Sequence, residues 1–279
     1  MSRNLKLAIS TLGCPNWSFA QVLENFSSYP VQGIEVRGID GVMDADKMPL
    51  LTPERLPELH ELLRSHRLPI IGFGTSFSFH DAERLPQTLS DARRTIDILS
   101  RAGIPAMRVF GNSIPDPTRR DQTIRQVADA LCQLADYAQP RNVQVNLEVH
   151  GDFNSTETLK PIVEAIADRH PAAGILWDIE HSDKVCGDDF MPFYSLIRPV
   201  LRHIHVKDYL RNREPDAKDW TLVKCGDGDI PIRDILTRVL DDGYDGFLSF
   251  EWEKKWHPDI DEPEVAFPHF VAKMHEWLD

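Results

Sequence analysis

Short apolar runs alternate with longer amphipathic segments from one end of the chain to the other. The runs have the length and the Val, Ile and Leu content of buried parallel strands. Strands are predicted at residues 5–10, 33–37, 69–73, 106–110, 143–148, 174–178, 203–205 and 247–251. Apolar residues at helical spacing predict helices at residues 17–26, 52–66, 85–102, 118–138, 155–169, 190–197, 232–240 and 265–278.

This order of elements indicates parallel strands joined by helical crossovers, because each predicted strand is followed by a predicted helix. The length of 279 residues is normal for one barrel of such units. We therefore predict an α/β fold, a single (β/α)8 TIM barrel that forms one domain over residues 1–279. A doubly wound open sheet is the alternative. It is disfavoured because no G-x-G-x-x-G motif follows the first predicted strand.

Composition and charge restrict the partners. Hydrophobic residues make up 42% of the chain, enough for a full core, and the net charge is −13. An acidic surface repels nucleic acid and anionic membranes, so neither is expected as a partner. The four cysteines are far apart and form no C-x-x-C pair, which argues against disulfides and a thiolate zinc site. Because no apolar run resembles a signal or a membrane span, we expect a cytoplasmic protein that binds a small molecule, with a homo-oligomer left open.

Acidic or imidazole side chains end four of the predicted strands. They are Glu148, Asp178, His205 and Glu251. If the strands close into one barrel, their C-terminal ends meet at one mouth, where three carboxylates would repel one another unless a cation lay between them. We therefore predict a site for one divalent metal ion, Mn²⁺, Mg²⁺, Co²⁺ or Zn²⁺. The oxygen-rich set suits the first three ions better than a structural zinc, which prefers Cys and His ligands.

The segments around these four residues carry a family resemblance. They are Leu147–His150 (LEVH), Trp177–His181 (WDIEH), His203–Asp208 (HIHVKD) and Gly243–Glu251 (GYDGFLSFE). They resemble the xylose-isomerase-like superfamily of sugar isomerases and epimerases, and the likeness extends over nearly the whole chain. The resemblance implies a TIM barrel and a metal held by the same four side chains.

The resemblance also implies roles for other residues. In the ketose epimerases of the superfamily, glutamates corresponding to Glu148 and Glu251 bind the metal and move protons. A histidine three residues after the metal-binding Asp and an arginine six residues after the metal-binding His hold substrate oxygens, and these positions are His181 and Arg211 here. Neighbours of Arg211 that could serve in its place are Lys207 and Arg213. The rest of the substrate pocket is expected to include His150, Lys207, Trp252 and Lys255.

One position departs from the epimerase pattern. Epimerases of the tagatose type carry a further glutamate six residues after the first metal ligand, and this chain has Asn154 there. A specific tagatose- or psicose-epimerase assignment therefore does not follow.

We expect a divalent-metal-dependent isomerase or epimerase that acts on a small ketose, keto-sugar or inosose. Proton removal next to the carbonyl would give a metal-stabilised enediolate. A dehydratase or lyase on a cyclic keto-polyol, resembling inosose or 3-dehydroshikimate dehydratases, is the alternative, because it shares this first step. A nuclease of the same superfamily is disfavoured, because the third and fourth strand ends lack additional histidines. A sugar-binding barrel without turnover is a further alternative.

Three charged residues are expected to have a structural role. Glu35 and Arg37 end the second predicted strand, and Arg108 lies in the fourth. Alternation can point them into the barrel, where we expect an ion pair. The long connections at residues 208–231 and 253–263 are expected to line the active face.

Overall fold

The computed structural model describes residues 5–211 and 220–278, and in it the predicted apolar runs form a closed barrel. Neighbouring strands pair in the ring order β1-β10-β7-β6-β5-β4-β3-β2, all in parallel. The strands of the barrel are β1 (Leu7–Ser10), β2 (Gly33–Val36), β3 (Ile70–Ser78), β4 (Ala106–Phe110), β5 (Gln144–Glu148), β6 (Ala173–Asp178), β7 (Leu201–Val206) and β10 (Leu248–Phe250).

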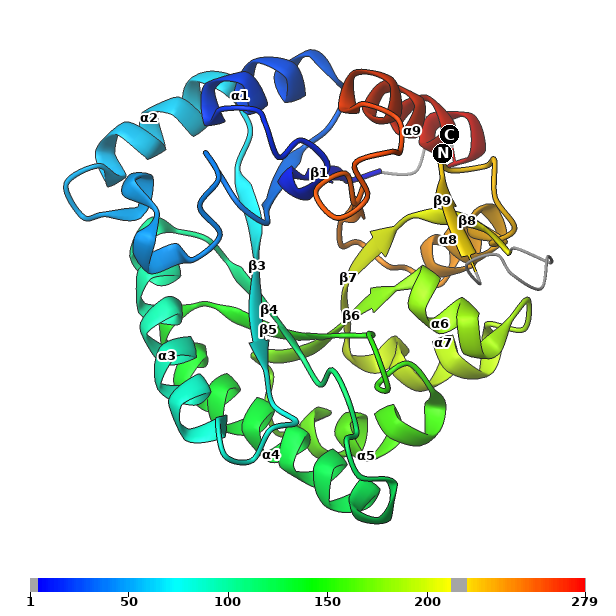
Figure 1. Ribbon diagram of the computed structural model, residues 1–279. Coiled ribbons are helices and arrows are strands. Elements are labelled where there is room, and N and C mark those ends of the chain that lie inside the picture. Colours follow the sequence, from blue (N-terminus) through cyan, green and yellow to red (C-terminus); the bar gives the residue numbers. More distant parts are fainter. Residues whose placement is uncertain (1–4, 212–219, 279) are drawn as a thin grey trace.

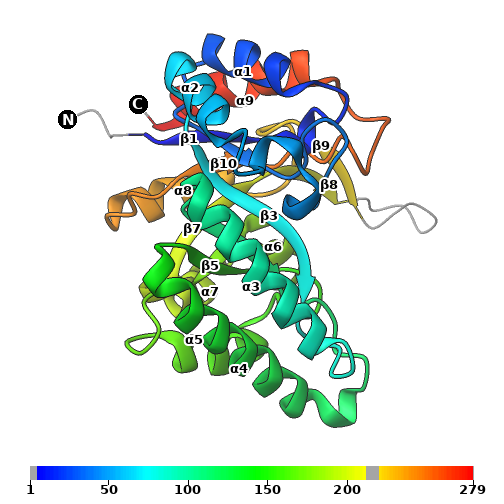
Figure 2. The same cartoon turned by 90° about the vertical axis from the view of Figure 1, so that its left-hand side faces the viewer.

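Helices surround the barrel on its outside, as Figure 1 shows along the barrel and Figure 2 from the side. This arrangement confirms the predicted (β/α)8 barrel. No helix among the described residues is long and apolar enough to cross a bilayer. The helices are α1 (Phe19–Ser28), α2 (Leu56–His66), α3 (Leu85–Ala102), α4 (Arg120–Ala138), α5 (Thr156–Ile166), α6 (Ile179–Cys186), α7 (Met191–Ile197), α8 (Ile232–Asp241) and α9 (Pro263–Leu278).

Helix ends follow local sequence signals. Ser18 caps α1, because its hydroxyl accepts a hydrogen bond from the backbone N–H of Gln21 while the Gln21 side chain accepts one from the Ser18 backbone. Gly103 ends α3 with a φ of 73°, which a glycine adopts without strain. On the inner face of α3, Ile96 and Leu99 are fully buried, and each such side chain stabilises the fold by about 1.5–3 kcal/mol.

Two elements near the barrel mouth were not predicted. Helix α6 follows β6 directly, and it has only eight residues, too few for a clear hydrophobic period. Strands β8 (Asp208–Arg211) and β9 (Trp220–Val223) form an antiparallel hairpin within the long connection after β7. Both elements lie at the carboxyl ends of the strands, so they shape the face on which barrel enzymes carry their sites.

Candidate metal centre

The four side chains predicted as metal ligands meet at the mouth of the barrel. Ligand atoms of Glu148, Asp178, His205 and Glu251 all lie within 4.8 Å of one another. All four residues are buried, and none is more than 4% exposed. Strand register produces this meeting, because Asp178 and His205 are paired neighbours on β6 and β7, while Glu148 ends β5 and Glu251 follows β10.

The donor set fits a divalent cation. Glu148 Oε2, Asp178 Oδ2 and His205 Nδ1 are buried, and none of them makes a hydrogen bond of regular geometry to any residue that the structure describes. Their charged neighbours are Arg108, Lys207 and Glu251, at 3.0, 2.8 and 3.2 Å respectively. Buried polar atoms without such partners are costly, and a cation would satisfy all three at once. Carboxylate oxygens with one imidazole nitrogen are ligands that Mn²⁺, Mg²⁺, Co²⁺ and Zn²⁺ accept.

Asp178 serves the site and the local fold together. It is the N-cap of α6, and its Oδ1 accepts a hydrogen bond of 3.3 Å from the backbone N–H of His181. The cap uses one carboxylate oxygen and leaves Oδ2 directed at the cluster. It also places His181 in the first turn of α6, which explains structurally why a histidine three residues after this aspartate lies beside the site.

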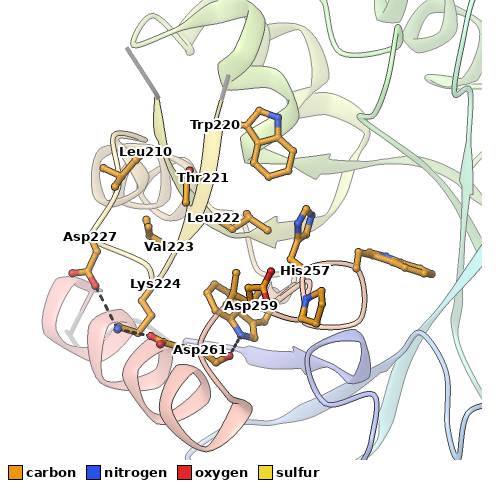
Figure 3. Close-up of a pocket in the computed structure, with 14 residues that line it drawn as sticks. Leu210, Trp220, Thr221, Leu222, Val223, Lys224, Asp227, His257, Asp259 and Asp261 are labelled. Atoms are coloured by element: carbon orange, nitrogen blue, oxygen red, sulfur yellow. Dashed lines mark hydrogen bonds and ion pairs between the residues drawn. The ribbon is translucent and has the colours of Figure 1, made fainter. Parts of the chain in front are cut away.

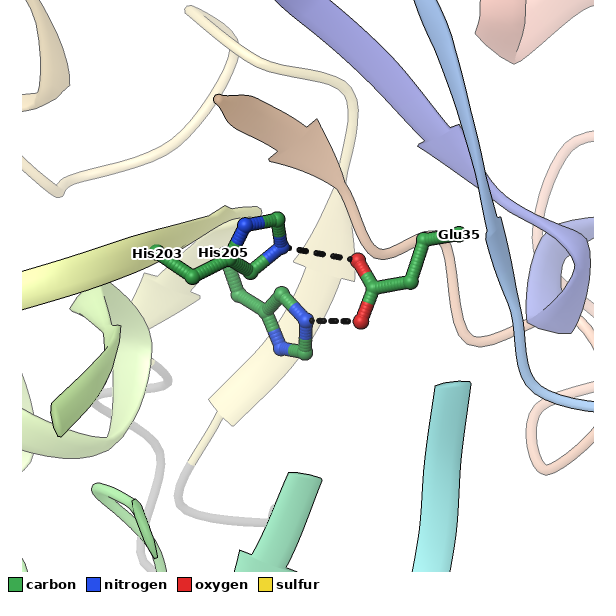
Figure 4. A group of neighbouring side chains, drawn as sticks. All are labelled: Glu35, His203 and His205. Atoms are coloured by element: carbon green, nitrogen blue, oxygen red, sulfur yellow. Dashed lines mark hydrogen bonds and ion pairs between the residues drawn. The ribbon is translucent and has the colours of Figure 1, made fainter. Parts of the chain in front are cut away.

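The carboxylate of Glu35 orients the His205 ring by contacting Nε2, the ring nitrogen that does not face the other predicted ligands. Its Nε2 lies 2.8 Å from Glu35 Oε1, and its Nδ1 lies 3.2 Å from Glu251 Oε2. Figure 4 shows the Glu35 carboxylate facing both rings, with one oxygen toward His203 and the other toward His205. A carboxylate that holds one ring nitrogen of a histidine fixes which nitrogen is free to bind a metal.

Glu35 also accepts hydrogen bonds from other side chains of the barrel interior. Its Oε2 lies 3.0 Å from His203 Nε2 and accepts a hydrogen bond of 2.5 Å from Ser249 Oγ. Burial alone would raise the pKa of Glu35, but the neighbouring His205 and His203 outweigh it and hold this pKa well below its ordinary value. The expected ion pair of Glu35 with an arginine is therefore wrong, because the histidines of β7 reach the carboxylate instead.

Lys207 supplies a buried positive charge beside the cluster. Its Nζ lies 2.8 Å from both Asp178 Oδ2 and Glu251 Oε2, and 2.6 Å from Glu253 Oε1. Glu180 Oε2 is a fourth carboxylate oxygen, 3.6 Å away. Burial would lower the pKa of Lys207, yet Asp178 and the other carboxylates hold it well above the ordinary value. The structure thus places Lys207 within the carboxylates, and its side chain is only 1% exposed.

Two arginines approach the opposite side of the cluster. Arg108 Nε lies 3.0 Å from Glu148 Oε2, and the guanidinium stacks over the ring of Phe110 at 4.1 Å. Arg37 donates a hydrogen bond of 2.8 Å to Ser76 Oγ. Gly74 makes room for both arginines, because an added Cβ would lie 2.8 Å from an atom of each.

The pKa values of the clustered carboxyl groups are shifted in different directions. Burial raises the pKa of Glu148 despite Arg108. Burial and nearby carboxylates raise the pKa of Asp178 to about 8 although Lys207 lies beside it. Burial acts in the same direction on Glu251, but His205 and Lys207 outweigh it and hold its pKa well below the ordinary value. Without a bound cation, the four groups do not all carry their charges at neutral pH.

A cleft of about 350 Å³ opens above the cluster. Glu148, Glu251, His150 and His181 line it, and the two histidine rings lie 4.1 Å apart. Burial lowers the pKa of His150 to about 4 and holds that of His181 well below its ordinary value. Both imidazoles are therefore neutral at physiological pH, and each can donate or accept a hydrogen bond from a ligand.

Other residues predicted to bind substrate lie away from this cleft. Arg211 donates to Asp183 at 2.7 Å and also pairs with Asp188, and it does not line the cleft. Trp252 is 1% exposed, stacks on Phe250, and donates from Nε1 to the carbonyl oxygen of Asp261 at 2.8 Å. Lys255 lies over the ring of Trp256. Arg213, the other arginine considered, lies outside the described residues.

Several cleft residues were not predicted as site residues. Arg37 could have been found by the same strand-end argument that identified the metal ligands, but it was assigned to the core together with Arg108, which lies in the middle of β4. Glu180 could have been found from the WDIEH motif. Phe110 ends β4, and the others lie after the strand ends, in segments whose course the sequence does not determine. The unpredicted lining residues are Leu12, Arg37, Arg108, Phe110, Glu180, Lys184, Trp220, Glu253, Trp256 and His257.

Solved structures of several proteins resemble this fold. The IolI protein with a bound zinc atom superposes with a TM-score of 0.80 at 16% identity and 98% coverage of both chains. The probable 3-DHS dehydratase AsbF from Bacillus anthracis gives 0.74 at 18% identity, over 97% of this chain and 99% of that one. The 3-keto-D-glucoside 4-epimerase YcjR from E. coli gives 0.70 at 17% identity, over 98% and 99%. At these identities the likeness shows a shared fold.

A family comparison covers most of the chain. No curated protein sequence matches it. The family model described as "Xylose isomerase-like TIM barrel" matches residues 31–269, which include every strand of the barrel except β1. This match confirms the resemblance that the four ligand-bearing motifs indicated. The chain belongs to the xylose isomerase-like TIM barrel family.

Proposed function

We propose that this protein is a divalent-metal-dependent isomerase or epimerase of a small ketose, keto-sugar or inosose. The observation that carries the proposal is the buried cluster of Glu148, Asp178, His205 and Glu251, of which the two glutamates line a cleft. Three of the ligand atoms make no regular hydrogen bond among the described residues. Isomerases and epimerases of the family to which the chain belongs act on such carbonyl compounds. The structural neighbour YcjR bears the name of a keto-glucoside epimerase.

Glu148, Asp178, His205 and Glu251 would hold one ion of Mn²⁺, Mg²⁺, Co²⁺ or Zn²⁺. When bound, the ion would supply Lewis-acid polarisation of the substrate carbonyl, which acidifies the adjacent C–H. Glu35 would keep the imidazole of His205 oriented toward the ion through the 2.8 Å contact with Nε2. Lys207 would balance the negative charge of Asp178 and Glu251 from below the cleft, so we propose an electrostatic role for it rather than direct substrate contact.

Two glutamates are positioned to move the proton. Glu148 ends β5 and Glu251 follows β10, and strands β6 and β7 lie between these two in the ring. One of the two glutamates would remove the proton and the other would return one, and coordination to the ion would keep the base ionised at neutral pH. Because they approach from different strands, removal from one face and return to the other would invert the carbon.

The cleft offers neutral and cationic groups for the substrate hydroxyls. Arg37, His150 and His181 line it together with the two glutamates. Neutral imidazoles can donate to or accept from a hydroxyl without adding charge, and an arginine offers several N–H donors in a fixed plane. We propose that these three side chains hold the substrate, and that Arg211, which is bound by Asp183, does not.

A dehydratase on a cyclic keto-polyol is the second candidate. Its first step is the same proton removal, after which the intermediate expels a β-hydroxyl instead of regaining a proton. The fold shared with a probable 3-DHS dehydratase, over 97% of this chain, makes this outcome worth a direct test.

The test is a screen of ketoses, keto-sugars and inososes with the Mn²⁺-loaded protein in deuterated water, followed by proton NMR. The proposal expects deuterium at the carbon next to the carbonyl, together with a new epimer or isomer. A new unsaturated product would assign the dehydratase reaction instead. A protein that binds these compounds but exchanges no proton in any of them is a sugar-binding barrel, and the proposal fails.

A further inference from the structure

A second cavity adjoins the cleft above the cluster of predicted metal ligands, which is called the metal cleft from here on. It has a volume of about 550 Å³ and lies between the β8–β9 hairpin and residues 252–261 (Figure 3). The two cavities share three lining residues, Trp220, Trp256 and His257. A volume of this size accommodates a small-molecule ligand or a substantial part of one. The metal cleft therefore continues into a space that a single small ketose leaves unfilled.

The walls of the second cavity are aromatic and apolar. Trp220, Trp252 and Trp256 line it together with Leu222 and Val223. Trp256 is 52% exposed, although it is one of the largest apolar side chains of the chain. Trp252 forms a fixed wall, since its indole N–H is bound to the protein backbone. Aromatic faces pack against the C–H surfaces of sugar rings, so these walls suit a carbohydrate unit.

The charges of the second cavity favour a neutral occupant. Lys224 lies 2.6 Å from Asp261 Oδ2 and 3.9 Å from Asp227 Oδ2, so its charge is already balanced. Asp259 also lines the cavity. The described lining residues thus carry more carboxylates than cations, which repels a phosphate or a carboxylate. The same oxygens accept hydrogen bonds from hydroxyl groups.

At the junction of the two cavities, His257 is linked through Glu253 and Lys207 to the cluster of predicted metal ligands. His257 Nε2 lies 3.3 Å from Glu253 Oε2, and Glu253 in turn binds Lys207. The His257 ring packs edge-on against Trp220, with centroids 5.4 Å apart. On the other side, Lys184 Nζ lies 4.2 Å from the centre of the Trp220 ring. A ligand that passes the junction would therefore meet ordered side chains.

We propose that the second cavity is a subsite for a further sugar unit, so that the substrate is a neutral keto-disaccharide or a similar glycoside rather than a free sugar or a sugar phosphate. The keto ring binds at the metal cleft, and the attached unit passes Trp220 and Trp256 into the second cavity. This inference rests on the proposed function for the identity of the keto ring.

The test compares three probes that share one keto ring: 3-keto-D-glucose, 3-keto-cellobiose with the keto group on the non-reducing ring, and 3-keto-D-glucose 1-phosphate. Binding to the Mn²⁺-loaded protein is measured by calorimetry, and proton exchange by NMR in deuterated water. We expect 3-keto-cellobiose to bind roughly tenfold or more tightly than 3-keto-D-glucose, and the phosphate to bind more weakly than either.

Two variants locate the effect. Val223→Trp fills the second cavity from a half-buried wall position that does not line the metal cleft, and Val265→Trp is the matched control on the exposed face of α9. The preference for the disaccharide is expected to disappear in Val223→Trp and to remain in Val265→Trp, with binding of 3-keto-D-glucose unchanged in both. Trp256→Ala should also reduce the preference.

The inference is overturned if the wild type binds 3-keto-D-glucose and 3-keto-cellobiose equally, or if Val223→Trp keeps the preference. It is also overturned if Trp256→Ala changes only the oligomeric state measured by sedimentation, because Trp256 then serves a contact between copies. Binding of the disaccharide without proton exchange in any probe would support the subsite and count against the proposed function, so the two failures are distinguishable.

Discussion

Two clusters of titratable side chains share His205 and differ in how their atoms are satisfied. On the Nε2 side, Glu35 accepts contacts from His203, His205 and Ser249, and both of its oxygens are used. On the Nδ1 side, Glu148, Asp178 and Glu251 converge. Three of the four ligand atoms form no regular hydrogen bond among the described residues and have only ion-pair contacts of 2.8–3.2 Å. Both groups have the composition of a metal site, and only in the second do ion-pair contacts take the place of regular hydrogen bonds at three ligand atoms.

This difference indicates which of the two clusters binds a ligand. A carboxylate between two imidazoles and a hydroxyl is complete without an ion, because each polar atom has a partner. The cluster of three carboxylates around one imidazole is incomplete, since its ligand atoms are mostly acceptors and Arg108 and Lys207 offset only part of their negative charge. The Glu35 cluster therefore orients His205, and the Glu148 cluster uses the nitrogen that this orientation leaves free.

The largest expected effect follows from changing the glutamates of the incomplete cluster. Glu148→Gln and Glu251→Gln should each reduce turnover by a factor on the order of 10² or more, because each removes a carboxylate proposed to move the proton. Initial rates and deuterium incorporation at carbon are measured for both variants. Glu276→Gln, an exposed glutamate on α9, is the control and should keep full activity. Unimpaired incorporation in both cluster variants would exclude these glutamates as proton carriers.

A smaller effect, on the affinity for Mn²⁺, is expected from changing Glu35 in the complete cluster. Glu35→Gln should lower the affinity for Mn²⁺ by about 10–100-fold, the usual loss when an outer hydrogen-bond partner of a metal-binding histidine is removed. Asp178→Asn, which changes a direct ligand, should lower it further. Calorimetric titration of the metal gives both values, with circular dichroism as the check that each variant folds. Equal losses in the two variants would remove the distinction between the clusters.

The sequence predicted the residues of the incomplete cluster but not those of the Glu35 cluster. Glu148, Asp178, His205 and Glu251 could be predicted because parallel strands bring their carboxyl ends to one mouth whatever the details of packing. Glu35 was placed in the core with arginine partners. Its contact with His205 spans β1 and β10, which lie between β2 and β7 in the ring, and no local pattern reports which side chains meet across the interior.

Other misses have similar causes. Arg211 stands at the spacing of a substrate-binding arginine, but Asp183 and Asp188 of the α6 region pair with it, and the pattern of apolar residues did not predict α6 as a helix. Trp252 follows Glu251 directly, and adjacent residues at a strand end point to opposite sides. Its ring therefore packs into the layer between barrel and helices, stacked on Phe250.

The pH dependence of metal binding tests whether Asp178, in the incomplete cluster, has a raised pKa. Burial raises the pKa of Asp178 to about 8, so between its unfolded pKa near 4 and about 8 the folded, metal-free protein binds more protons than the unfolded chain. In that window rising pH destabilises the metal-free protein, and Mn²⁺ must displace a proton. Metal affinity should therefore fall by up to about tenfold per pH unit below pH 8. Calorimetry at pH 6, 7 and 8 measures it, and a flat profile would contradict the shifted pKa.

The smallest expected effect concerns the cleft above the clusters. His181→Asn should raise KM or lower kcat by roughly tenfold, because one hydrogen bond to the substrate is lost, while metal content stays unchanged. Metal analysis of the purified variant accompanies the kinetics. The matched change His60→Asn, on the outer helix α2, should alter neither. Loss of metal in His181→Asn would make His181 a ligand and reverse its assignment.

A crystal structure of the Mn²⁺-soaked protein, with the ion located by its anomalous signal, is the most direct test of the proposed metal centre. The account predicts one ion bound by Glu148, Asp178, His205 Nδ1 and Glu251 at about 2.0–2.3 Å, with the contact between Glu35 and His205 Nε2 retained. An ion held between Glu35 and His203, or two of the four predicted ligands turned away from the ion, would contradict it.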